Sequence, residues 1–208
     1  MKSYKFCTVS GQKEFNLELH NFPVADISIY PWDTAPHSLA YAVLAAGKDA
    51  LYVFMRSEEK DIRAIQTEQN GPIYTDSCLE FFLMPSLQSN LYLNIEANPK
   101  GVIYFSVGKE REGRLLITEE GPEDLQMEAQ VHPAQYGGNG WCVRYNLPYK
   151  LIQKYVPEFN PLDPLSMRGN FYKCGDGLSQ PHWGMWSKVG TEKPDFHRPE
   201  YFGSIIQG

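Results

Sequence analysis

The stretch LYLNIEANPKGVIYFSV, residues 91–107, holds two extended runs separated by a turn signal. In residues 91–97 apolar and polar side chains alternate, which is the period of a half-buried β-strand. Residues 101–107 are a second strand candidate, and Asn98-Pro99-Lys100-Gly101 supplies the residue types that favour a turn between them. The stretch therefore predicts two strands joined by a tight connection.

The same alternation recurs along the chain. In DLQMEAQV (124–131) and WCVRYNL (141–147), apolar residues fall on one side of the extended chain and polar residues on the other. Turn residues stand between the candidates at 47–49 and 137–140. Further strands are predicted at 39–45, 50–56, 77–84, 166–174 and 202–207. Many short strands separated by turns predict an all-β fold, an antiparallel β-sandwich with a jelly-roll-like path.

One short helix is predicted near residues 148–156. Pro148 suits a first-turn position, Leu151, Ile152 and Tyr155 have helical spacing, and Pro157 ends the run. No repeat, low-complexity tract or linker divides the 208 residues, so we expect a single domain over 1–208.

Composition excludes several classes of partner. The chain has 19 Lys+Arg against 25 Asp+Glu, a net charge of −6. It has no run of basic residues that could bind the phosphates of a nucleic acid, so we expect no nucleic-acid partner. No apolar run reaches the roughly 20 residues of a membrane span, and the start lacks a signal-peptide core. We expect a cytoplasmic protein that does not bind membranes, or a secreted one if a leader has been removed. Four scattered cysteines without a C-x-x-C predict free, buried thiols.

One face of the predicted sheet combines polar groups with aromatic rings. Sugars need planar donors and acceptors for their hydroxyls and an aromatic surface for their C–H faces. An ordinary solvated sheet face is the alternative interpretation. Three strands contribute to this mixed face: Tyr74, Asp76 and Glu80; Tyr92, Asn94, Glu96 and Asn98; and Arg168, Asn170 and Tyr172.

These strands resemble family 9 carbohydrate-binding modules, β-sandwich domains best known as appendages of xylanases. The first matching segment is Ile73–Leu83, with an aromatic residue, an acid and then Glu80-x-Phe. The resemblance covers nearly everything after about residue 50. It continues through Tyr92-x-Asn-x-Glu96-x-Asn98-x-x-Gly101, Trp141-x-Val-x-Tyr-x-Leu-Pro148, Arg168-x-Asn170-x-Tyr172, Trp186 and Phe196-His197-x-Pro199-x-x-Phe202-Gly203.

The resemblance implies that two aromatic rings enclose a mono- or oligosaccharide at a chain end, without catalysis. By this likeness Tyr74 and Trp186 form the two walls, and Trp183 lines the same pocket. A buried core position is the alternative for each tryptophan. Polar groups of the sheet and the neighbouring hairpin would bind the sugar hydroxyls: Glu80, Glu96, Asn98, Arg114 and Arg168.

Two positions depart from the family pattern. Tyr74 replaces the more usual tryptophan, and Glu96-x-Asn98 aligns with an Arg-x-Asn pair, which exchanges a donor for an acceptor. No cofactor is expected to be required. The resemblance allows a structural calcium ion, for which the loop acids Asp61, Asp76 and Asp195 are available, and the spacing of Cys and His residues gives no zinc motif.

Two other functions stay open. A glycoside hydrolase cannot use Asp76 with Glu80, because positions four apart on a strand lie roughly 13 Å apart, but Glu80 and Glu96 on adjacent strands could come within range. An interaction domain that has lost sugar binding would explain the change at Glu96, and its protein partner is not indicated by the sequence.

Overall fold

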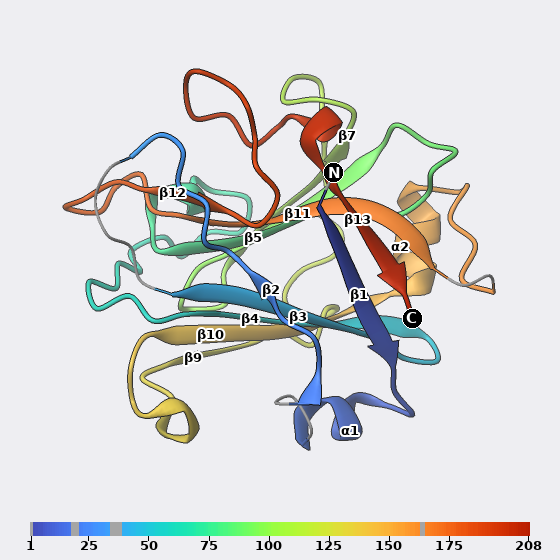
Figure 1. Ribbon diagram of the computed structural model, residues 1–208, viewed down its shortest axis with the longest axis horizontal. Coiled ribbons are helices and arrows are strands. Elements are labelled where there is room, and N and C mark those ends of the chain that lie inside the picture. Colours follow the sequence, from blue (N-terminus) through green and yellow to red (C-terminus); the bar gives the residue numbers. More distant parts are fainter. Residues whose placement is uncertain (1, 18–20, 34–38, 163–164) are drawn as a thin grey trace.

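The computed structural model describes residues 2–17, 21–33, 39–162 and 165–208. Two layers of strands face each other, as Figure 1 shows, and β1 runs along the side of both. The predicted all-β sandwich is confirmed. Within the described residues no helix is long and apolar enough to cross a membrane.

The first layer carries the polar face predicted above. Its strands lie in the order β8 (Leu115–Leu116), β7 (Ile103–Gly108), β6 (Tyr92–Ala97), β5 (Cys78–Met84), β11 (Ser166–Cys174) and β13 (Gly203–Gln207), and β12 (Trp183–Met185) pairs with β11. The second layer contains β3 (Ala40–Ala46), β4 (Ala50–Ser57), β10 (Trp141–Pro148) and β9 (Glu128–Val131), with β2 (Ala25–Asp26) beside β3.

Strand β1 (Ser3–Thr8) joins the two layers. Its first part, from Ser3, pairs with β13, and its end, Cys7 and Thr8, pairs with β3. Both pairings are parallel, whereas the other strand pairs are antiparallel. The antiparallel prediction therefore holds except at β1, a strand that was not predicted although Tyr4 and Phe6 alternate with exposed residues.

The predicted turns and helix have clear physical causes. Gly101 has a positive φ of 76°, which glycine adopts without strain, and the Asn98 side chain accepts hydrogen bonds from the amides of Lys100 and Val102. Helix α2 spans Tyr149–Tyr155, as predicted. A second helix, α1 (Gln12–Leu17), was not predicted, and short 3₁₀ turns occur among the described residues at Ile73–Thr75, Ala134–Tyr136 and Pro199–Tyr201.

The run 124–131 is a strand only in its second half. Gln126 has a positive φ of 48°, so the chain turns there and β9 begins at Glu128. Leu125 is nevertheless fully buried, as the alternation indicated.

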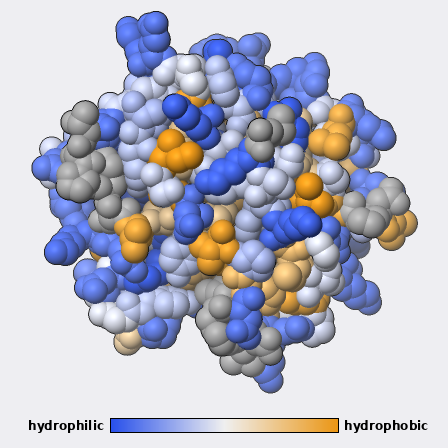
Figure 2. Space-filling view, in the orientation of Figure 1, coloured by the Kyte–Doolittle hydropathy of each residue, from blue (hydrophilic) through white to orange (hydrophobic). Residues whose placement is uncertain are grey.

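The main core fills the space between the layers. The inward-facing side chains of β5, β6 and β11 meet those of β3, β4 and β10 there. The opposite side of the first layer is also covered, because Phe82, Tyr92 and Tyr172 pack against Phe196 and Phe202 of the C-terminal segment. On the side of the molecule seen in Figure 2, apolar residues form scattered patches between hydrophilic ones.

Candidate functional site

A cavity of about 430 Å³ opens on the outer side of the first layer. Its floor is formed by β5, β6 and β11, and its walls come from the segments around residues 70–74, 104–114 and 194–197. This volume lies in the range that small-molecule sites occupy. The lining residues are Asn70, Gly71, Pro72, Tyr74, Glu80, Glu96, Tyr104, Arg111, Arg114, Cys174, Asp176, Trp183, Pro194, Asp195, Phe196 and His197.

Two aromatic side chains from different elements line the cavity and are partly open to solvent. Tyr74 lies in the 3₁₀ turn before β5 and is 47% exposed. Trp183 begins β12, directly opposite Cys174 of β11 in the strand register, which places it on the outer face. The indole N–H of Trp183 donates a hydrogen bond of 2.9 Å to Asp176, which fixes the orientation of the ring.

Two buried carboxyl groups lie at the floor. Glu80 and Glu96 stand opposite each other in the β5–β6 register, so their side chains leave the same face of the sheet. They are 3% and 6% exposed. Burial, and then the neighbouring carboxylate of Glu96, raise the pKa of Glu80 well above its usual value. Burial also raises the pKa of Glu96, while the Asn94 amide and Arg114 oppose the shift.

Basic groups form the rim above these acids. Arg114 places its guanidinium over the Tyr104 ring, 5.5 Å from the centroid, and Nη1 lies 3.3 Å from Nε2 of His197. Arg111 forms a 2.8 Å ion pair with Asp195. The rim and the floor together offer hydrogen-bond donors on one side and acceptors on the other.

Of the eight residues predicted to contact ligand, the structure brings five together in this cavity. They are Tyr74, Glu80, Glu96, Arg114 and Trp183. The other three lie elsewhere and have structural partners.

Trp186 is a core residue, and the prediction that it forms a wall of the sugar clamp is wrong. Its side chain is 2% exposed and packs edge-on against Tyr4 and Phe171, with ring centroids 6.2 and 5.8 Å apart. The ring also occupies the space that a Cβ at Gly203 would need. The aromatic residue that reaches the cavity from this segment is Trp183.

Asn98 and Arg168 hold the backbone and do not line the cavity. The Asn98 amide donates to Asp76 and to the carbonyl of Gln66, both at 3.0 Å, and its oxygen closes the turn to β7. Arg168 donates through Nη2 to the carbonyls of Pro199, Glu200 and Phe202. The Asn98 amide and Nη2 of Arg168 are therefore already used within the fold.

The acids considered for calcium do not gather into a site. Asp76 is fully buried, accepts the amides of Ile65 and Gln66, and precedes β5, so it does not share a strand face with Tyr74. Asp61 accepts a hydrogen bond from Ser179, and Asp195 pairs with Arg111. The group in the described chain that has the geometry for a metal is a different one: Cys78, Glu80 and Cys174.

Sequence reasoning missed several lining residues, and for two of them a signal existed. Tyr104 stands opposite Glu96 in the β6–β7 register, so alternation across the predicted turn would have placed it on the same face. Asp176 follows the end of β11 by two residues, where a strand meets its loop. Phe196 and His197 belong to the last motif of the family resemblance, which did not place them at the ligand, and they reach the cavity through the C-terminal segment.

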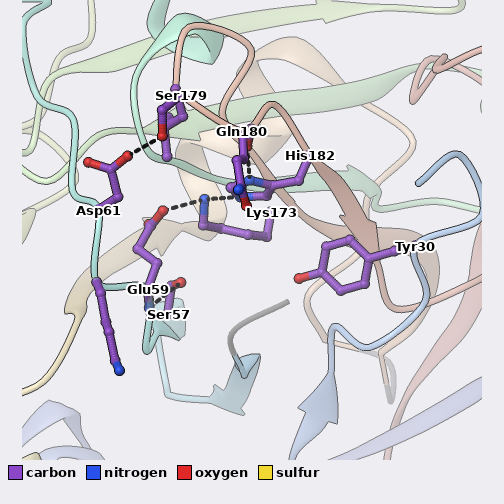
Figure 3. A pocket seen from close by; sticks show the side chains of 10 residues that line it. Tyr30, Ser57, Glu59, Asp61, Lys173, Ser179, Gln180 and His182 are labelled. Carbon is purple, nitrogen blue, oxygen red and sulfur yellow. Dashed lines mark hydrogen bonds and ion pairs between the residues drawn. The ribbon is translucent and has the colours of Figure 1, made fainter. Parts of the chain in front are cut away.

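A smaller cavity of about 130 Å³ lies at the other side of β11 (Figure 3). Lys173, which is 1% exposed, lies there between Glu59 and His182, with its Nζ 3.1 Å from the Glu59 carboxylate and 2.8 Å from Nε2 of His182. The Trp141 indole donates to the same carboxylate. The Lys173–Glu59 pair thus has hydrogen-bonded partners on both sides, as a buried ion pair needs.

Comparison with known proteins gives one family. The family model described as carbohydrate-binding family 9 matches residues 12–207. No curated protein matched the chain.

Solved structures with the same fold cover essentially the whole chain. A candidate carbohydrate-binding protein from Bacteroides uniformis is 25% identical with a TM-score of 0.81, covering 100% of this chain and 98% of its own. A family 9 carbohydrate-binding module from Caldicellulosiruptor kristjanssonii, in complex with glucose, is 13% identical with a TM-score of 0.64. The match covers 100% of this chain and 96% of the module. A family 9 module from the same organism in complex with cellotriose is 14% identical with a TM-score of 0.61. The match covers 99% of this chain and 93% of the other.

Proposed function

The chain belongs to carbohydrate-binding family 9, and on that premise we propose that it binds the end of a saccharide, without catalysis, in the cavity lined by Tyr74 and Trp183. The observation that carries the proposal is the meeting of these two rings with the carboxyl groups of Glu80 and Glu96 and the guanidinium of Arg114. Aromatic surfaces suit the C–H faces of a sugar ring, and the charged groups suit its hydroxyls.

The position of the cavity favours a chain end over the middle of a polysaccharide. Glu80, Glu96 and Cys174 belong to a continuous sheet that closes the floor, so a ligand enters from the side of the loops. Loop groups such as Arg111 and Arg114 would contact the part of the ligand nearest to solvent. Glucose and cellotriose, the ligands of the two Caldicellulosiruptor structures, are the first probes to use.

The test is isothermal titration calorimetry with glucose, cellobiose, cellotriose and xylose oligosaccharides. We expect saturable binding of at least one sugar and a loss of roughly tenfold or more in the Tyr74→Ala variant. Tyr136→Ala is the matched control, because Tyr136 is also partly exposed but lies over Arg56, away from the cavity.

Two results would contradict the proposal. If a broad sugar panel gives no binding to the folded protein, the domain has a different ligand, such as a protein partner. If incubation releases reducing sugar from an oligosaccharide, and Glu80→Gln abolishes the release, the cavity is an active site of a hydrolase.

A further inference from the structure

Four groups that can bind a metal converge beneath the sugar cavity. Cys78 and Cys174 stand opposite each other in the β5–β11 register, and Glu80 and Glu96 stand opposite each other in the β5–β6 register. Cys78 and Glu80 are two apart on β5, so all four side chains leave the same face of the sheet. All four residues are buried.

The distances among the first three suit one ion. The two sulfur atoms and a carboxylate oxygen of Glu80 lie within 4.8 Å of one another. The Glu80 Oε1 atom is 2.9 Å from the sulfur of Cys174 and 3.9 Å from that of Cys78. Tetrahedral zinc, with bonds of about 2.3 Å to sulfur and about 2.0–2.2 Å to oxygen, separates its ligand atoms by roughly 3.5–3.8 Å. Shifts of less than about an ångström would therefore bring these three ligand atoms to the spacing of a tetrahedral site.

Glu96 supplies a second observation, independent of the sulfur distances. Its Oε1 accepts a hydrogen bond from Asn94, but Oε2 is buried and has no hydrogen-bond partner among the described residues. Within that part of the chain, no lysine or arginine forms an ion pair with Glu80 or Glu96. Burial disfavours the ionised form of both carboxyl groups, and a cation bound between them would stabilise that form.

We propose that Cys78, Cys174, Glu80 and Glu96 bind a thiophilic divalent cation of the zinc class. Thiolates select zinc over calcium and magnesium, which prefer sets of oxygen ligands. The ion has a route of entry, because Cys174, Glu80 and Glu96 line the cavity. The site is distinct from the loop acids considered for calcium.

The experiment uses the full chain without an affinity tag, kept reduced with a phosphine and freed of metal. Cobalt(II) is titrated first, because thiolate ligation gives an intense charge-transfer absorption, and zinc is then added in competition with a chromophoric chelator. We expect one ion per chain. Cys78→Ser, Cys174→Ser and Glu96→Gln should each weaken zinc binding by roughly tenfold to a hundredfold or more. Cys142→Ser is the matched control, because Cys142 is a buried free thiol in a different cluster, and it should bind as the wild type does.

A second measurement needs no variant. X-ray absorption at the zinc edge of the wild-type protein should show two sulfur ligands, with oxygen completing the shell. Less than one tightly bound ion, a shell without sulfur, or unchanged affinity in folded Cys78→Ser and Cys174→Ser variants would overturn the proposal. Because the assays contain no sugar, they succeed or fail independently of saccharide binding.

Discussion

The two tryptophans of the segment 183–186 provide a matched pair of substitutions with opposite expected effects. Trp183→Ala removes a ring that lines the cavity, whereas Trp186→Ala removes a ring from the core. We expect the first variant to lose saccharide affinity and remain stable. We expect the second to lose stability and, while folded, to bind sugar.

The magnitudes follow from the surroundings of each ring. Trp186 is 2% exposed and packs against Tyr4 and Phe171, so its truncation should lower the free energy of unfolding by about 3–5 kcal/mol. Trp183 is partly exposed, and its truncation should cost about 1 kcal/mol through the lost hydrogen bond to Asp176. A sugar face that buries roughly 80 Å² of apolar surface on Trp183 gains about 2 kcal/mol, which corresponds to roughly thirtyfold in the dissociation constant.

Urea denaturation and calorimetric titration of both variants measure the two effects side by side. The intrinsic fluorescence of the wild type should also change when a sugar binds, and that change should be absent in Trp183→Ala. The reverse outcome would refute the assignment: a Trp186→Ala variant of normal stability that no longer binds sugar, together with a Trp183→Ala variant that binds normally.

Three other predictions test groups around the site. Arg168→Met should lower the free energy of unfolding by about 1–3 kcal/mol, because three backbone carbonyls lose their shared donor. The dissociation constant for sugar should not change; urea denaturation and calorimetric titration measure the two quantities. Asn98→Ala should cost about 2–3 kcal/mol in the same denaturation assay and likewise spare affinity, since Asn98 bonds Asp76 and the turn but not the cavity. His197 contacts Tyr92 and Arg114, and burial, followed by the charges of Arg114 and Arg111, holds its pKa far below the usual value. As pH falls, the His197 imidazole is therefore protonated in the unfolded chain before it is protonated in the folded one. The free energy of unfolding should fall by up to about 1.4 kcal/mol per pH unit below about pH 6.5, and His197→Asn should remove that part of the pH dependence. Thermal melts from pH 7 to 5 that show the same pH dependence in both proteins would contradict this.

The fold was largely predictable because alternation is a local property. Each predicted strand from 39 onward corresponds to an observed one, although the run 124–131 becomes a strand only at Glu128. The unpredicted elements include β1, β12 and α1, and also the two-residue strands β2 and β8. Strand β1 is held by parallel pairing to two distant strands, β12 has only three residues, and α1 depends on packing Phe15 against the outer side of the second layer. Only β1 carries an alternation, with Tyr4 and Phe6 buried between exposed residues, and it is too short to stand out in the sequence.

The site was harder to predict because a polar residue on the right face can still have a structural partner. Glu96 and Asn98 lie two apart and face the same way, yet Asn98 is used by the turn and Asp76 while Glu96 reaches the cavity. Arg168 likewise belongs to the predicted polar face, but the C-terminal segment covers it and takes its hydrogen bonds. Which polar residues stay available depends on how that segment folds over the sheet.

Strand geometry itself separates the two tryptophans. Trp183 pairs with Cys174, β12 ends at Met185, and the Trp186 amide still donates to the carbonyl of Phe171, so the chain runs beside β11 from one residue to the other. Side chains three apart on an extended chain point to opposite faces, so if one of these rings faces the cavity the other must face the core. The same parity places Cys174 with Trp183 on the cavity side, above the cluster of Cys78, Glu80 and Glu96. A proposal that assigns both tryptophans to one ligand is therefore excluded by the backbone, whatever the ligand is.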